Sequence, residues 1–367
     1  PILTAPSPPP LPLILWHGLG DNYAADGIQD VLDLAENINP GTFTYAIRLG
    51  DDASSDRTAS FIGNTTTQIA DVCDAISSHP VLGRAPAIDA LGFSQGGLLL
   101  RSLIQRCGDR IKVRSLVTFG SPHSGISAFK NCAPTDWLCQ AAFGLLRGNS
   151  WSDFVQSRLV PAQYYRTLNE STGEPTEEYL EFSNLLADVN NEHEVKNETY
   201  RKHLAALEKF VMYRFEEEDA VLPAESTWFA DVWQQPPPDD DGEKEGKRIV
   251  TPLRDRDLYT EDWLGLKELD ERNALEFRKT PGKHMQISDK DLTQVFKKDF
   301  GPPKEGGIGS GWAGWDGEEI SAILDHLQQI SRIELNFRGP HLPKDRGTFQ
   351  VEPTEDEFQD VLTVQHV

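Results

Sequence analysis

The stretch Ala87-Ile88-Asp89-Ala90-Leu91-Gly92-Phe93-Ser94-Gln95-Gly96 places one serine between two glycines, directly after an apolar run. The apolar run is typical of a buried strand, and Leu98-Leu99-Leu100 begins a segment that predicts a helix ending near Cys107. In the G-x-S-x-G pattern, a sharp strand-to-helix turn presents the serine hydroxyl, and small flanking residues avoid collisions at the bend. We therefore interpret Ser94 as a candidate nucleophile. The alternative is an ordinary buried serine in a glycine turn.

Strand and helix patterns alternate on both sides of this turn. Apolar runs predict strands at 13–16, 43–49, 87–93, 113–119 and 210–215, with helices near 27–38, 65–77 and 98–107. A β-α-β-α order predicts a mostly parallel central sheet flanked by helices. Together with the serine turn, this order predicts an α/β-hydrolase fold with a helical cap insertion.

The chain is expected to form one catalytic domain, residues 1–303, followed by a C-terminal extension, 304–367, that is poorly ordered. Strand signals fade over about 121–209, which we interpret as the cap. The segment 234–248 contains three consecutive prolines and several aspartates, so we expect a solvated loop there.

Charge and hydropathy argue against nucleic-acid binding and against a membrane-spanning helix. The net charge of −23 disfavours nucleic acid, because phosphate backbones are bound by clustered Lys and Arg. No run approaches the roughly 20 apolar residues that a membrane-spanning helix needs, so no transmembrane segment is expected. The chain begins at Pro1, and a cleaved upstream signal segment is a hypothesis. We expect no metal and no cofactor, because the cysteines and histidines lack metal-ligand spacing.

The four cysteines favour disulfides over four buried reduced thiols, which remain the alternative. Cys132 and Cys139 are close enough in sequence to close a small loop, which leaves Cys73 and Cys107 to join two predicted helices. Three Asn-x-Ser/Thr sequons are candidate glycosylation sites, at Asn64, Asn169 and Asn197. Disulfides and sequons together predict the secretory pathway, with the lysosome or vacuole or the extracellular space as destination.

Acyl-transfer chemistry needs two N–H donors for the developing oxyanion. One is normally the backbone N–H after the nucleophile, here that of Gln95. The other is expected from the loop after the first strand, His17-Gly18-Leu19-Gly20, where glycines on both sides leave the Leu19 N–H unobstructed. We interpret His17 itself as a structural histidine.

In this fold the general base is a histidine late in the chain, because the order is serine, acid, histidine. His284 lies in a turn after an apolar segment and is the preferred base, whereas the other late histidines, His326, His341 and His366, lie in the extension. His123 is a rival on chemistry, but it precedes the acid and is interpreted as structural. Glu218 and Asp219 both follow the strand after the cap, and only one of two neighbouring residues is expected to face the base.

These segments resemble the palmitoyl-protein thioesterase family over roughly residues 13–302. The resemblance lies in the segments Leu15-Trp16-His17-Gly18-Leu19-Gly20-Asp21, Gly92-Phe93-Ser94-Gln95-Gly96-Gly97, Leu258-Tyr259-Thr260-Glu261-Asp262 and Gly282-Lys283-His284-Met285-Gln286. It implies that Ser94 and His284 are nucleophile and base, and that the cysteine pairs Cys73/Cys107 and Cys132/Cys139 match family disulfides. A gap-free count puts the family's catalytic Asp at Glu218, while residue type favours Asp219. The segment after Pro303 has no counterpart.

The resemblance implies hydrolysis of long-chain acyl thioesters, with S-acylated proteins or peptides as substrates and acyl-CoA as a further candidate. The predicted groove for the acyl chain is formed by cap residues: Phe129, Trp137, Leu138, Phe143, Leu145 and Leu146. For each of these, membership of the cap core is an equal alternative. Two rival functions stay open: a lipase or carboxylesterase on the same fold, and a catalytically silent acyl-binding protein.

Overall fold

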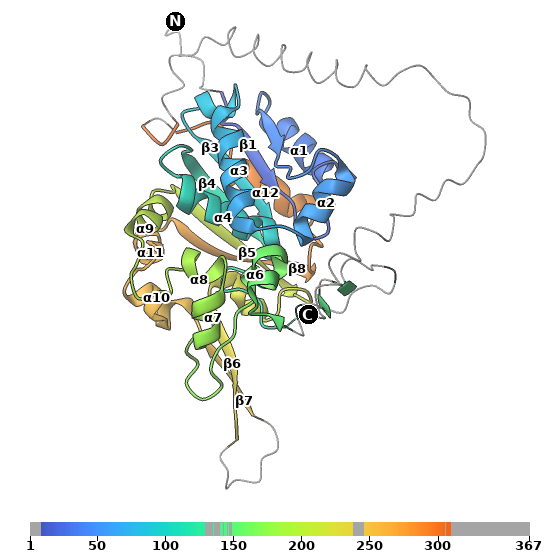
Figure 1. The fold of residues 1–367 in the computed structure, drawn as a ribbon. Coiled ribbons are helices and arrows are strands. Elements are labelled where there is room, and N and C mark those ends of the chain that lie inside the picture. Colours follow the sequence, from blue (N-terminus) through green and yellow to red (C-terminus); the bar gives the residue numbers. More distant parts are fainter. Residues whose placement is uncertain are drawn as a thin grey trace, which may run out of the picture. The chain divides into compact units, whose positions relative to one another are not determined.

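Six strands form the central sheet of the computed structural model, in the order β2-β1-β3-β4-β5-β8 (Figure 1). Their bounds are β1 Leu13–Trp16, β2 Thr44–Ala46, β3 Ile88–Phe93, β4 Val113–Phe119, β5 Lys209–Glu217 and β8 Leu275–Lys283. Every neighbouring pair in this sheet is parallel. The structure describes residues 9–128, 135, 140–141, 143–144, 146, 149–237, 246–304 and 306–309, all within one compact unit.

Alternation along β1 explains how the sheet is covered on both faces, since successive side chains point to opposite sides. Leu13 and Leu15 pack in one apolar cluster with helices α1 Asp26–Ile38 and α12 Asp289–Lys298. Ile14 and Trp16 pack in a second cluster, with α3 Thr65–Ser78 and α4 Gln95–Cys107. The parallel sheet is thus buried between two helical layers, as such sheets require.

The chain leaves the sheet after β4 and returns at β5, so the predicted cap range falls between these two strands (Figure 1). The described helices of this segment are α6 Asp153–Arg158, η2 Val160–Tyr164, α7 Glu177–Phe182, α8 Leu186–Val189 and α9 Glu198–Ala205. The remaining helices are α2 Ala53–Phe61, η1 Leu82–Arg84, η3 Ala224–Trp228, η4 Leu253–Asp255, α10 Asp257–Thr260 and α11 Leu266–Glu271. In the part of the chain described, no helix is long and apolar enough to cross a membrane.

The prediction of a plain loop over 234–248 was wrong at both ends. An antiparallel hairpin of β6 Asp231–Gln235 and β7 Lys247–Thr251 occupies them, with Trp233 paired to Ile249. Neither face of this hairpin is fully buried, so its strands do not need a regular apolar pattern. Their many polar residues therefore gave no strand signal in the sequence. The strand expected at 43–49 is also shorter, Thr44–Ala46.

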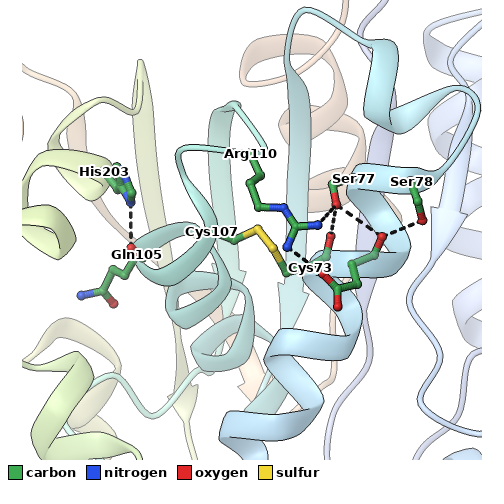
Figure 2. Close-up of a disulfide and its surroundings, with 8 residues drawn as sticks. Cys73, Ser77, Ser78, Gln105, Cys107, Arg110 and His203 are labelled. Carbon is green, nitrogen blue, oxygen red and sulfur yellow. Dashed lines mark hydrogen bonds and ion pairs between the residues drawn. A yellow bond between two sulfur atoms is a disulfide. The ribbon is translucent and has the colours of Figure 1, made fainter.

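A disulfide joins Cys73 of α3 to Cys107 of α4, which confirms this predicted pair (Figure 2). The two Cα atoms are 6.2 Å apart, within the usual disulfide range. Arg110, just beyond α4, reaches the same part of α3 and donates to Asp74 and Ser77. The helix after Ser94 is therefore fastened covalently to its neighbour. The other predicted pair, Cys132 and Cys139, lies outside the described residues, as does 310–367 of the predicted extension.

Candidate active site

Ser94 occupies the sharp turn between β3 and α4, with a φ of 50°. Its backbone N–H donates to the Phe119 carbonyl at 2.8 Å, which fixes the turn against β4. The flanking glycines are required by close backbone approach: a Cβ at Gly92 would lie 2.3 Å from Gly97 Cα, and one at Gly96 would lie 2.2 Å from the Trp16 oxygen. A side chain at either position would force the strand and helix apart. The turn therefore projects the Ser94 hydroxyl beyond the carboxyl end of the sheet.

The sheet topology explains why other polar residues gather at this edge. The chain runs from β1 outward to β2 and then crosses to β3 on the other side of β1. Connections diverge at such a switch point and leave a crevice beyond the carboxyl ends of the strands. His17 follows β1 and Ser94 follows β3, while Glu218 and His284 follow β5 and β8.

The structure brings Ser94, His284 and Glu218 into one hydrogen-bonded row. His284 Nε2 lies 2.9 Å from Ser94 Oγ, and His284 Nδ1 lies 2.9 Å from Glu218 Oε2. Because a carboxylate only accepts hydrogen bonds, the proton belongs on Nδ1, and Nε2 can accept the serine O–H. Between the two candidate acids, this hydrogen bond to the imidazole is made by Glu218.

Glu218 and His284 are themselves held in place. Glu218 Oε1 accepts the backbone N–H groups of Ala220 and Val221, each at 2.9 Å, and its side chain is 1% exposed. The His284 ring packs edge-on against Phe215, with ring centres 5.6 Å apart. Two backbone donors thus fix the orientation of the buried carboxylate.

The loop predicted to supply an oxyanion donor forms a tight turn. Asp21 N–H donates to the Gly18 carbonyl at 3.3 Å, and Gly20 has a φ of +79°, the value that the third residue of a type II turn adopts. Leu19 is the second residue of this turn, so its N–H takes no part in the turn hydrogen bond. The Gln95 N–H is the first of helix α4 and has no acceptor within the helix. Both predicted donors therefore have N–H groups that the local backbone leaves available.

His17 and His123 lie in the interior, and both interpretations as scaffold residues fit their contacts. His17 is 2% exposed, and its Nε2 contacts Asp56 Oδ2 at 2.9 Å. Burial would raise the pKa of Asp56, but hydrogen bonds from His17 and from the backbone outweigh burial and lower it. His123 is fully buried, stacks on Phe229 and contacts Thr118, and burial holds its pKa well below the ordinary value.

Sequence reasoning missed Asp56, Ser60 and Tyr164 altogether. Asp56 and Ser60 come from α2, a helix that was not predicted, and Tyr164 comes from the cap and donates to the Gln95 side chain at 3.0 Å. The only signal for the first two is their spacing of four residues, which puts two small polar side chains on one helix face.

Of the predicted groove residues, Phe143 and Leu146 are described, and both are buried in a small apolar cluster with Phe61 and Leu159. The side chain of Leu19 packs against this cluster. The cluster thus begins at the loop that carries a predicted oxyanion donor. Phe129, Trp137, Leu138 and Leu145 lie outside the described residues.

A cavity of about 430 Å³ lies elsewhere, between the cap and the β6–β7 hairpin. Its walls include Ser124–Ser127, Tyr165–Leu168 and Asp231–Gln234, but none of Ser94, Glu218 and His284. Arg166 and Asp231 in its wall form a buried ion pair. This cavity is therefore separate from the hydrogen-bonded row.

Comparison with known proteins identifies the family of this chain. The sequence profile of the family described as palmitoyl protein thioesterase matches residues 12–284. The palmitoyl-protein thioesterase-dolichyl pyrophosphate phosphatase fusion 1 of Schizosaccharomyces pombe is 36% identical over 299 residues, covering 80% of this chain and 44% of that protein. Palmitoyl-protein thioesterase 1 of Caenorhabditis elegans is 32% identical over 292 residues, covering 79% of this chain and 92% of that protein.

A more distant relative, from Xenopus laevis, is named a lysosomal thioesterase and is 24% identical, covering 74% of this chain and 85% of that protein. The family profile spans all six strands of the central sheet, from the first strand to His284. With its parallel sheet and serine turn, the chain therefore belongs to the palmitoyl-protein thioesterase family of α/β-hydrolases.

Proposed function

We propose that this chain hydrolyses long-chain acyl thioesters, foremost palmitoyl groups on cysteines of S-acylated proteins or peptides. The observation that carries the proposal is the hydrogen-bonded row from Ser94 through His284 to Glu218, with both contacts of the imidazole at 2.9 Å. A hydroxyl, an imidazole and a carboxylate in this order form the catalytic triad of serine hydrolases. Family membership supports the choice of an acyl thioester as substrate.

In the proposed reaction, Ser94 Oγ attacks the thioester carbonyl while His284 Nε2 takes the hydroxyl proton. Glu218 holds the imidazole by Nδ1 and stabilises the positive charge that forms on it. The N–H groups of Leu19 and Gln95 donate to the oxyanion of the tetrahedral intermediate. The cysteine sulfur then leaves as the thiol with the proton that His284 had taken, and the neutral His284 activates a water that hydrolyses the acyl-enzyme and regenerates Ser94.

The triad can hydrolyse both esters and thioesters, so it does not by itself select the substrate class. A cysteine thiol has an ordinary pKa of about 8.5, so it leaves with less proton assistance than an alkoxide. For the acyl chain we propose the cap cluster around Phe143 and Leu146, which meets the Leu19 side chain. Acyl-CoA carries the same thioester and acyl chain and is a second candidate substrate.

Two experiments separate this proposal from its rivals. Turnover of a palmitoyl thioester and of the matched oxygen ester is compared: a thioesterase prefers the first, and a lipase or carboxylesterase the second. A fluorophosphonate probe should label the wild type and leave Ser94→Ala unlabelled. A wild type that neither reacts with the probe nor hydrolyses either substrate would leave a silent acyl-binding protein as the better description.

For its place of action we propose the lysosome or vacuole or the extracellular space. The Cys73–Cys107 disulfide suits an oxidising compartment. In the sequons at Asn64, Asn169 and Asn197, each side-chain Oδ1 accepts two backbone N–H groups, whereas a glycan would be attached to Nδ2. Glycosidase treatment of the cellular protein should lower its apparent mass, and an unchanged mass would count against this route.

A further inference from the structure

The face of helix α2 turned toward the oxyanion loop carries two buried polar side chains, Asp56 and Ser60, which are 0% and 1% exposed. They are four residues apart and therefore lie on one side of the helix. Asp56 contacts His17, at the start of the loop, and also accepts the Tyr23 N–H just after it. Ser60 contacts the loop itself, and its contacts extend to the nucleophile turn.

Ser60 binds both backbone segments that carry the proposed oxyanion donors. Its Oγ accepts the Gly20 N–H at 2.8 Å, directly beside Leu19, and donates to the Arg57 carbonyl at 2.6 Å. Its carbonyl accepts the side-chain N–H of Gln95 at 3.1 Å. Arg57 Nε donates to the Gly20 carbonyl at 3.0 Å, so helix α2 holds Gly20 by both of its backbone groups.

We propose that Ser60 is a positioning residue that fixes the separation and direction of the two oxyanion N–H groups, those of Leu19 and Gln95. The inference rests on the proposed function of these two groups. Leu19 precedes Gly20 in the tight turn, so anchoring the Gly20 N–H fixes the peptide plane on the carboxyl side of Leu19. Gln95 carries the second N–H on its own backbone, and its side chain donates to the backbone carbonyl of the same serine.

The expected effect follows from the directional nature of hydrogen bonds, which weaken steeply as distance and angle depart from the optimum. Removing one oxyanion donor outright typically lowers kcat about 10²- to 10³-fold. Ser60→Ala removes the hydroxyl that anchors the Gly20 N–H but keeps the carbonyl that holds the Gln95 side chain. It therefore loosens the Leu19 donor without removing either N–H group, and we expect a fall in kcat of roughly 10- to 50-fold. KM should change little, because the oxyanion exists only after attack on the carbonyl.

The test uses the full chain and a pair of inhibitors. Ser94 Oγ attacks the carbonyl of a long-chain alkyl trifluoromethyl ketone, and the resulting hemiketal presents an oxyanion to the two N–H groups. The matched secondary alcohol has the same chain but no carbonyl, so it forms no oxyanion. Ser60→Ala should bind the ketone about 10- to 50-fold more weakly, with kcat lowered to match, while its affinity for the alcohol stays that of the wild type. Thr58→Ala is the control, because Thr58 is an exposed residue of the same helix whose hydroxyl bonds only within α2.

If Ser60→Ala does not fold, Ser60→Cys provides the same test, since its sulfur is a weak acceptor for the Gly20 N–H and still fills the space of the hydroxyl. Unchanged kcat and ketone affinity in the folded variant would overturn the role of Ser60 and leave the proposed function intact. Equal losses for ketone and alcohol would also overturn it, because they indicate general loosening. A wild type without Ser94-dependent hydrolysis would overturn the proposed function, and this inference with it.

Discussion

Replacing Glu218 by Gln tests the proposed triad most directly. Glu218 accepts three hydrogen bonds, each at 2.9 Å: one from His284 Nδ1 and two from the backbone N–H groups of Ala220 and Val221. In Glu218→Gln, the amide oxygen stays with the two backbone donors, and the amide nitrogen then lies beside Nδ1, a donor facing a donor. The ring is driven toward the tautomer with its proton on Nε2, which cannot accept the Ser94 hydroxyl.

The expected fall in kcat follows from the loss of the productive imidazole tautomer and of the negative charge beside it. The corresponding Asp-to-Asn change in a Ser-His-Asp protease lowers kcat about 10⁴-fold, or roughly 5.5 kcal/mol of transition-state stabilisation. We expect Glu218→Gln to lower kcat about 10³- to 10⁴-fold with a small change in KM. Thiol release from a palmitoyl thioester, followed with a chromogenic disulfide, measures both constants. The unfolding midpoint of the variant shows whether the buried amide is tolerated.

Two matched variants sharpen the result. Glu218→Asp keeps the charge but shortens the side chain by about 1.5 Å, so the carboxylate cannot reach both the ring and the backbone donors. Its kcat should lie between those of the wild type and Glu218→Gln. Asp219→Asn should keep most activity. The reasoning fails if Glu218→Gln retains more than a tenth of the wild-type kcat, or if Asp219→Asn loses as much.

Three further predictions concern stability and the acyl chain. Burial lowers the pKa of His123, so the unfolded chain binds this proton first as pH falls, and stability is lost below about pH 6.5. For this group the loss is at most about 1.4 kcal/mol per pH unit, and His123→Phe should remove it, as urea unfolding at about pH 7.5 and 5 would show. Cys73→Ser opens a loop of 34 residues and should cost about 3–4 kcal/mol; a midpoint equal to that of the wild type would contradict the disulfide's role. Leu146→Ala, in the buried cap cluster, should raise KM more for palmitoyl than for butanoyl thioesters, and equal changes would remove this cluster from the proposed groove.

The element order could be predicted from the sequence because it depends on local patterns. The apolar run before Ser94 indicates a strand, and the glycines around Ser94 indicate a tight turn. Both signals come from residues only a few positions apart. The same holds for the helices that carry Cys73 and Cys107, where apolar residues recur at helical spacing. The hairpin at 231–251 escaped prediction because its side chains are largely polar and its pairing is not a local property.

Which acid meets the histidine depended on tertiary structure. Simple alternation would place Glu218 and Asp219 on opposite sides, but the pairing of β5 with β8 shifts register between Phe215 and Glu217, so counting along the strand cannot tell which residue faces His284. The contacts of Asp56 and Ser60 with the His17–Gly20 loop join residues about forty positions apart. The sequence by itself determined the sharp turn, the candidate base and the family resemblance, because these are carried by short segments. Only packing of the helices and strands decided the acid and the scaffold of the oxyanion loop, because both depend on how distant segments approach one another in space.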